Sequence, residues 1–271
     1  MAVPEIEKFT AMIDALSYWL GYQTKIGRGG LIHEASFRYP IADAITAKDI
    51  SIERVELERL HPIFKSKKID LVIYDKLGNT QDDNLQEIFE FKLSKRDTAK
   101  EYGDEHQAVF DDVVRLAYYN KNSGKECYFL MCGPFVDFNA YFVNQQETVK
   151  AENGLNIVPS RQSETKKEWL PKGFYKDWFG FIINEEKEKE FTSNSEWGLK
   201  LFQKKYKFRD GVENLFKESF IKIKTRCMAI TPYETDRSHA VGIWKIEASN
   251  SPQSIMNSST STFLPNPASV D

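Results

Sequence analysis

The sequence has few cysteines and histidines, no long hydrophobic run and no excess of positive charge. Its three cysteines, Cys127, Cys132 and Cys227, are odd in number and lack the spacing of a zinc knuckle. We therefore expect reduced, mostly buried thiols in a cytoplasmic protein. The four histidines form no paired zinc-binding motif, which argues against zinc chemistry, and the P-loop motif of nucleotide-binding proteins is absent.

Hydrophobicity and charge exclude three further classes of protein. No apolar run approaches the roughly 18 residues of a transmembrane helix, and the acidic N-terminal segment lacks the basic and apolar regions of a signal peptide. We therefore expect neither membrane insertion nor secretion. The net charge is −3, from 37 basic and 40 acidic residues among 271, which excludes a protein that coats DNA through its overall charge. Any contact with nucleic acid must come from a local basic patch, or from an acidic site balanced by a metal ion.

The first half of the chain alternates between helical and strand patterns. Apolar residues recur at helical spacing from Glu5 to Leu20, and a second helical stretch follows at about 31–48, where Pro40 is expected to kink or restart the helix. Strands are predicted at 50–60, 69–74 and 87–93, a helix at 106–120 and a doubly covered strand at 126–132. The predicted order is α, α, β, β, β, α, β, and the strands at 69–74 and 87–93 should pair as an antiparallel hairpin.

The second half of the chain is more polar and less regular. We expect residues 1–144 to form the core, 145–172 a linker or insertion, 173–248 a C-terminal α+β accessory region and 249–271 a disordered tail. Within the accessory region, strands are predicted at 177–184, 227–233 and 242–248, a polar and partly helical stretch at 185–206, and a helix at 210–222. The predicted fold class is α/β, with a mixed sheet flanked by helices.

Three charged residues on the predicted hairpin form the candidate site. Asp70 begins an otherwise apolar strand, and Glu90 and Lys92 lie two positions apart on the next strand, so they share one face. Two neighbouring carboxylates repel each other unless a cation lies between them, and Mg²⁺ suits such a pair together with a phosphate oxygen. A lysine beside them can hold or activate a water molecule, or neutralise charge on phosphorus.

This pattern resembles a known signature. Asp70, followed after a hairpin loop by Glu90-Phe91-Lys92, is similar to the D…(D/E)-x-K motif of the PD-(D/E)XK, or restriction-endonuclease-like, nuclease superfamily. The resemblance covers roughly residues 5–135, and Ile69 stands where the family name has proline. It implies an α-β-β-β-α-β core and a site for Mg²⁺, with Mn²⁺ also possible. In that family a glutamate on the preceding helix often joins the metal site, and Glu34 lies in the matching place.

Each of these residues also has a simpler interpretation. Asp70, Glu90 and Lys92 would make an ordinary cross-strand ion pair on an exposed face. Glu34 would be a surface carboxylate, or the partner of Arg38 one helical turn away. On the helix at 106–120, Asp111, Asp112 and Arg115 are expected to face away from the buried stripe, and Asp111 is expected to pair with Arg115.

Five basic residues flank the motif, namely Lys65, Lys67, Lys68, Lys95 and Arg96. They are placed to contact the phosphates of a nucleic acid. The alternative is a solvated strand edge that lysines protect from aggregation.

The resemblance implies a Mg²⁺-dependent endonuclease that hydrolyses DNA phosphodiester bonds, in a setting such as bacterial restriction or antiphage defence. DNA is a more natural substrate than RNA, and a homodimer or a partner protein of a defence system is compatible with this function. The alternative, from a different class, is a catalytically inactive nuclease-like module that binds a protein partner or nucleic acid.

Overall fold

The computed structural model describes residues 3–47, 50–94, 99–135, 138, 149–150, 156–157, 178–192, 199–209, 220–231 and 238–248. Lys95, Arg96, the predicted tail at 249–271 and most of the predicted linker and of the predicted helix at 210–222 lie outside these residues.

The N-terminal half contains the elements that carry the candidate site. The helices are α1 (Val3–Lys25), the short 3₁₀ helix η2 (Glu34–Phe37), α2 (Arg38–Thr46) and α3 (Ala99–Ser123). The strands are β1 (Val55–Leu60), β2 (Lys68–Tyr74), β3 (Leu85–Leu93) and β4 (Glu126–Pro134). The α, α, β, β, β, α, β order agrees with the sequence patterns.

The C-terminal half adds mainly strands. They are β5 (Val149–Lys150), β6 (Asn156–Ile157), β7 (Glu186–Thr192), β8 (Phe220–Ile230) and β9 (His239–Ala248), with one helix, α6 (Leu199–Lys205), among the described residues. The strand patterns in CMAITPY and GIWKIEA are confirmed within β8 and β9, which run together as a hairpin.

One mixed sheet of seven strands organises the protein, in the order β1-β2-β3-β4-β9-β8-β7. Strands β2 and β3 pair antiparallel, as predicted, whereas β3 and β4 are parallel and α3 connects them. The predicted α/β class is therefore confirmed. The stretch that we expected to form an accessory region instead supplies β7, β8 and β9 to the same sheet, next to β4.

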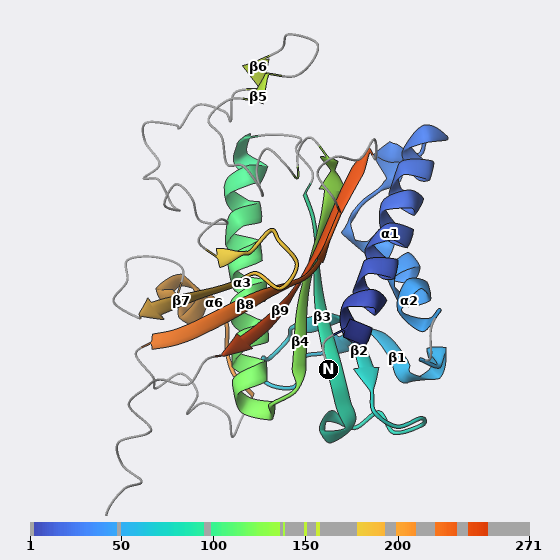
Figure 1. Ribbon diagram of the computed structural model, residues 1–271. Helices are drawn as coiled ribbons and strands as arrows, with labels where there is room; N and C mark the ends of the chain where they lie inside the picture. The colour runs from blue at the N-terminus through green and yellow to red at the C-terminus, as the bar shows by residue number, and fades with distance from the viewer. Residues whose placement is uncertain are drawn as a thin grey trace, which may run out of the picture.

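Helices cover the sheet on both faces. Figure 1 shows α1 and α2 on one face and α3 on the other. Strand β4 alternates its side chains between the two layers, with Cys127, Phe129 and Met131 toward α3 and Tyr128, Leu130 and Cys132 toward α1. This confirms the prediction of a doubly covered central strand. All three cysteines are free and buried, as expected, and no helix in the described ranges is long and apolar enough to cross a bilayer.

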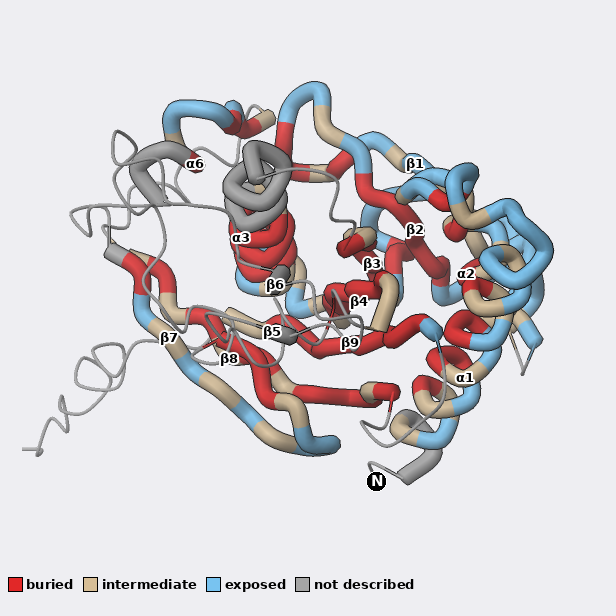
Figure 2. The backbone as a smooth tube through the Cα atoms, turned by 90° about the horizontal axis from the view of Figure 1, so that it is seen from above, coloured by how far each residue is buried: buried red, intermediate tan, exposed pale blue. Residues whose placement is uncertain are grey.

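The helix α3 is enclosed on all sides along its middle. Every residue from Val109 to Tyr119 is buried, and in Figure 2 the sheet curls around this helix from β2 to β7, with α6 beside it. Phe110 stacks on Trp178 at 5.3 Å, and Tyr118 stacks on Phe202 at 6.1 Å. Asp111, Asp112 and Arg115, the charged residues of this buried middle part, therefore lie inside the protein, and the prediction that they face away from the buried stripe is wrong.

Three local predictions also need correction. The second helical stretch begins as η2, and α2 starts only at Arg38, so Pro40 lies in the first turn of a helix, where its missing N–H costs little. Strand β1 begins at Val55, after a 3₁₀ turn. Within 177–184 the described residues form no strand: Trp178 and Phe179 are buried, and the chain turns at 181–184.

The stretch at 186–192 is a strand rather than the polar, partly helical segment that its composition predicts. It pairs with β8, and cross-strand ion pairs join Glu188 to Lys222 at 2.5 Å and Glu186 to Lys224 at 2.8 Å. Tertiary pairing overrides the helical preference of glutamate and lysine here.

Substitution of Gly242 tests the packing at the centre of the sheet. A methyl group at Gly242 would lie 2.2 Å from Cη2 of the buried Trp244. Gly242→Ala should therefore lower the free energy of unfolding by about 1–3 kcal/mol in urea titrations. Gly30→Ala is the control, because nothing lies within 4 Å of the added carbon. A Gly242→Ala variant as stable as the control would contradict this packing.

Candidate active site

Asp70 and Glu90 lie opposite each other where the pairing of β2 and β3 ends. The last paired positions are Leu71 and Phe89, so the next step in the same register brings Asp70 to Glu90. Asp70 Oδ2 accepts a hydrogen bond of 2.8 Å from the backbone N–H of Phe91 and thereby replaces the next ladder bond. The two residues are buried, with 9% of Asp70 and 2% of Glu90 exposed.

Lys92 lies on the same face of β3 as Glu90 and joins two further acids to the cluster. Its Nζ is 2.9 Å from Glu34 Oε2 and 3.4 Å from Asp112 Oδ2. The structure thus brings together the four residues that the sequence singled out, Glu34, Asp70, Glu90 and Lys92.

Arg38, which was considered only as a partner of Glu34, binds other acids. Its Nη2 donates to Asp70 Oδ1 at 2.6 Å, and its Nη1 pairs with Glu58. Glu34 instead pairs with Lys92. Arg38 therefore neutralises Asp70 from the α2 side of the sheet.

Two residues that sequence reasoning missed complete the cluster, and both come from α3. Arg115 Nη2 donates to Glu90 Oε1 at 2.8 Å and to Asp112 Oδ1 at 2.7 Å. The expected pair of Asp111 with Arg115 is wrong, because Asp111 instead accepts hydrogen bonds from Tyr206 and Lys205. Asp112 contacts Lys92 of the sheet as well as Arg115, whereas Asp111 is held by side chains from the C-terminal half of the chain.

Burial controls the protonation of this cluster. The pKa of Glu90 lies well above its usual value because burial penalises the carboxylate and because Asp70 and Asp112 repel it, against the attraction of Arg115. Burial also raises the pKa of Glu34, against the attraction of Lys92. Burial alone would lower the pKa of Lys92, but the surrounding acids Asp112, Glu34 and Asp70 raise it above its usual value. Lys92 is therefore a charged ammonium group, and Glu90 is the acid most ready to take up a proton.

The carboxylates suit a hard divalent cation in number and chemistry. Asp70 and Glu90 supply the one or two carboxylates with which Mg²⁺ usually binds, together with water and substrate phosphate. The pKa of Glu90 is raised chiefly by burial, against the attraction of Arg115. A metal ion would therefore compete with Arg115 for Glu90 and with Arg38 for Asp70. Among the described residues no three histidine, cysteine or acidic side chains converge as a complete metal cage. Asp70 and Glu90 provide oxygen ligands from neighbouring strands, and Glu34 is a further acid of the same cluster, held by Lys92.

The flanking basic residues are only partly placed at the cluster. Lys68 pairs with Glu58 at 2.9 Å, Lys67 lies over the ring of Tyr206 at 4.8 Å, and Lys65 is exposed.

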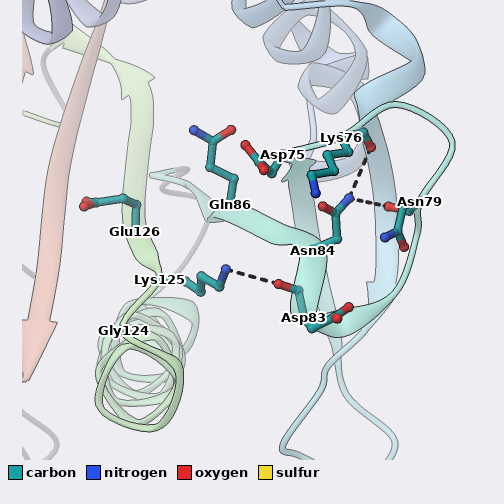
Figure 3. Close-up of a pocket in the computed structure, with 9 residues that line it drawn as sticks. All are labelled: Asp75, Lys76, Asn79, Asp83, Asn84, Gln86, Gly124, Lys125 and Glu126. Carbon is teal, nitrogen blue, oxygen red and sulfur yellow. Dashed lines mark hydrogen bonds between the residues drawn. The ribbon is translucent and has the colours of Figure 1, made fainter.

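A separate polar pocket lies at the far end of the strands, where β2 ends and β3 and β4 begin (Figure 3). Asn84 fastens the connecting loop through hydrogen bonds to the carbonyls of Lys76 and Asn79, and Lys125 reaches the carbonyl of Asp83. None of the candidate residues lines this pocket.

Comparison with known proteins identifies no relative: no protein-family model, no curated protein and no solved structure gives a significant match. The geometry and electrostatics of this cluster are therefore the observations that bear on function.

The pH dependence of stability tests the state of Glu90. Because its pKa is higher in the folded than in the unfolded chain, the folded state binds more protons between the two values. Stability is therefore lost as pH rises from about 4.5 through the folded pKa. Glu90→Gln removes this loss, so in EDTA the variant should gain on wild type in urea unfolding as pH rises. Glu87→Gln, which removes a carboxylate paired with Lys8 on the same strand, is the control. A Glu90→Gln variant that does not gain on wild type as pH rises would refute the assignment.

Removal of Arg115 tests the buried ion pairs. Arg115→Met leaves Glu90 and Asp112 without their shared cation, which should cost about 3–5 kcal/mol of unfolding free energy at neutral pH. Arg59→Met is the control, because the partners of Arg59, Glu56 and Asp82, remain in contact with solvent, and it should cost less than about 1 kcal/mol. Equal losses in the two variants would contradict the buried network.

Proposed function

We propose that the chain is a Mg²⁺-dependent endonuclease that hydrolyses phosphodiester bonds of DNA, with Mn²⁺ able to replace Mg²⁺. The single observation that carries the proposal is the meeting of Asp70, Glu90 and Lys92 at the end of two paired strands. The arrangement of β1, β2, β3, α3 and β4 supports it, because an antiparallel hairpin followed by a helical crossover to a parallel strand is compatible with a restriction-endonuclease-like core.

In this proposal Asp70 and Glu90 hold the metal ion and Glu34 contributes as a further acid. The ion, when bound, would supply positive charge for the phosphate oxygens and for the leaving oxygen. Glu90 would bind it as a carboxylate, so metal binding would release the proton that burial favours on this residue.

Lys92 has the role of positioning a water molecule and neutralising charge on the phosphate. Its ammonium group is held by Glu34 and Asp112, and these acids raise its pKa. A lysine that stays charged donates hydrogen bonds and does not take a proton from water. Of the two roles that the sequence left open for Lys92, its electrostatic surroundings therefore favour positioning over deprotonation.

The wider context follows from the same proposal. Lys65, Lys67 and Lys68 would contact substrate phosphates, and DNA is preferred over RNA as the substrate. A cytoplasmic role in restriction or antiphage defence, with a homodimer for cutting both strands or with a partner protein, is the setting that the motif implies.

One observation favours the alternative, an inactive module that binds nucleic acid or a protein. Arg38 and Arg115 already neutralise Asp70 and Glu90, so the acids have cationic partners before any metal arrives. In a module these arginines would be permanent structural partners, and no metal would be needed.

Cleavage assays test the proposed activity. With Mg²⁺ or Mn²⁺ the purified chain should nick or cut plasmid DNA, and Asp70→Asn or Lys92→Met should reduce the rate at least about 100-fold. The first variant removes a carboxylate that would hold the metal ion, and the second removes the ammonium group that would neutralise charge on the phosphate. Glu87→Gln and Lys8→Met are matched controls, since this pair joins α1 to the opposite end of β3. Undiminished cleavage by both site variants would exclude the site.

Thermal unfolding separates the nuclease from the module. A metal-binding site gains stability from the ion, so millimolar Mn²⁺ should raise the Tm of wild type and not that of Asp70→Asn. Binding of DNA with neither a metal-dependent Tm shift nor cleavage would favour the module.

A further inference from the structure

Two short segments that are far apart in the sequence lie side by side next to the candidate site. Residues 63–68 and 204–209 meet through an antiparallel bridge between Phe64 and Phe208. The backbone N–H of Lys65 donates to the carbonyl of Lys207 at 2.8 Å, and that of Arg209 donates to Ile63 at 2.9 Å. We call these paired segments the basic ribbon.

Buried aromatic side chains anchor the ribbon to the core. Phe64 and Phe208 stack at 4.9 Å, and both are buried, as is Tyr206. Every apolar side chain of the ribbon thus faces the core, whereas Lys65, Lys68, Lys204, Lys205 and Lys207 are exposed.

The charge of the ribbon is entirely of one sign. Its twelve positions contain no acidic residue and seven basic ones, although the whole chain carries a net charge of −3. Lys68 and Lys205 pair with acids from outside the ribbon, Glu58 and Asp111. In the described part of the chain, the remaining cations of the second segment, Lys204, Lys207 and Arg209, have no carboxylate within ion-pair distance.

The ribbon reaches the candidate site through Tyr206. Within the ribbon, Lys67 Nζ lies 4.8 Å from the centre of the Tyr206 ring. Arg115 Nη1 lies 3.4 Å from the Tyr206 hydroxyl, and Arg115 Nη2 binds Glu90. Burial lowers the pKa of Lys67, and so does the positive charge of Arg115 and Lys205, against the attraction of Asp111 and Asp112. One side chain, that of Arg115, therefore connects Tyr206 of the ribbon to Glu90, the proposed metal-binding acid.

We propose that the basic ribbon binds the phosphate backbone of the nucleic-acid substrate and leads it to the acidic cluster. This inference rests on the proposed nuclease function, and it adds residues 204–209, which no motif indicates, to the substrate-binding surface. Contacts of lysine and arginine with phosphates give affinity without reading sequence, so the ribbon contributes binding strength and not base preference.

The chemistry of the ribbon favours nucleic acid over other anionic partners. A protein interface has an apolar core, often aromatic, and a membrane-binding surface usually inserts apolar side chains. The ribbon buries all of its apolar residues and exposes only cations and Ser66. Its surface therefore matches a regular row of phosphates better than it matches either alternative.

The salt dependence of binding tests the proposal. The full chain in EDTA, where cleavage cannot proceed, is titrated against a fluorescein-labelled DNA duplex of mixed sequence, and anisotropy is followed between about 50 and 200 mM KCl. Lys204→Gln/Lys207→Gln should weaken binding several-fold at 100 mM KCl and should reduce the slope of log K against log salt by about two.

A second double variant is the matched control. Lys76→Gln/Lys121→Gln removes two exposed lysines at the opposite end of the strands, so its affinity and slope should equal those of wild type. Unchanged binding by the ribbon variant, or absence of DNA binding by wild type, would overturn the proposal. Binding to phosphatidylserine vesicles that is as tight as binding to DNA, and that the ribbon variant loses equally, would also overturn it in favour of a membrane.

The binding and cleavage assays can refute the two proposals separately. If the wild-type chain shows no metal-dependent cleavage but the ribbon variant loses DNA binding, the nuclease proposal falls and the ribbon stands. If the chain cleaves DNA through Lys92 while the ribbon variant binds like wild type, the ribbon falls and the nuclease stands.

Discussion

The contact between Arg115 and the carboxylates of Glu90 and Asp112 is the interaction on which the rest of the structure depends. All three groups are buried, so the loss of Arg115 would leave buried carboxylates without a cation and would destabilise the folded state. This contact fixes α3 against β3 and keeps Glu90 beside Asp70. It also holds Asp112 where it contacts Lys92. A single guanidinium group thus connects the core packing of the central helix to the geometry of the candidate site.

The sheet makes this burial possible because it wraps around α3. Strands β9, β8 and β7 continue the sheet beyond β4 and curl to the far side of the helix (Figure 2), so that α3 has no solvent-facing side along its middle. The C-terminal half therefore helps to build the site although it contributes none of the candidate acids. It encloses Arg115, and it supplies Tyr206 and the second segment of the basic ribbon.

Much of the site could be predicted from local patterns, whereas its supporting partners could not. The alternation of EIFEFKL places Glu90 and Lys92 on one face, and the apolar run around Asp70 signals a buried charge that needs a partner. The roles of Arg115 and Asp112 in the site were not predicted, because charged residues on a helix normally face solvent. The signal that was available is the sequence VFDDVVRLAYY, whose apolar residues surround the charges on every side of the helix. The bridge between Phe64 and Phe208 depends on contacts across more than half of the chain, which no local pattern encodes.

The account makes one central claim, that Asp70 and Glu90 form the binding site for a divalent cation with Lys92 alongside. A crystal structure of the wild-type chain grown with Mn²⁺ tests it most directly. The account predicts an anomalous peak between the carboxylates of Asp70 and Glu90, with the ammonium group of Lys92 on the same side of the sheet. A well-ordered structure at millimolar Mn²⁺ in which Arg38 and Arg115 keep both acids, and in which no metal lies between them, would contradict it.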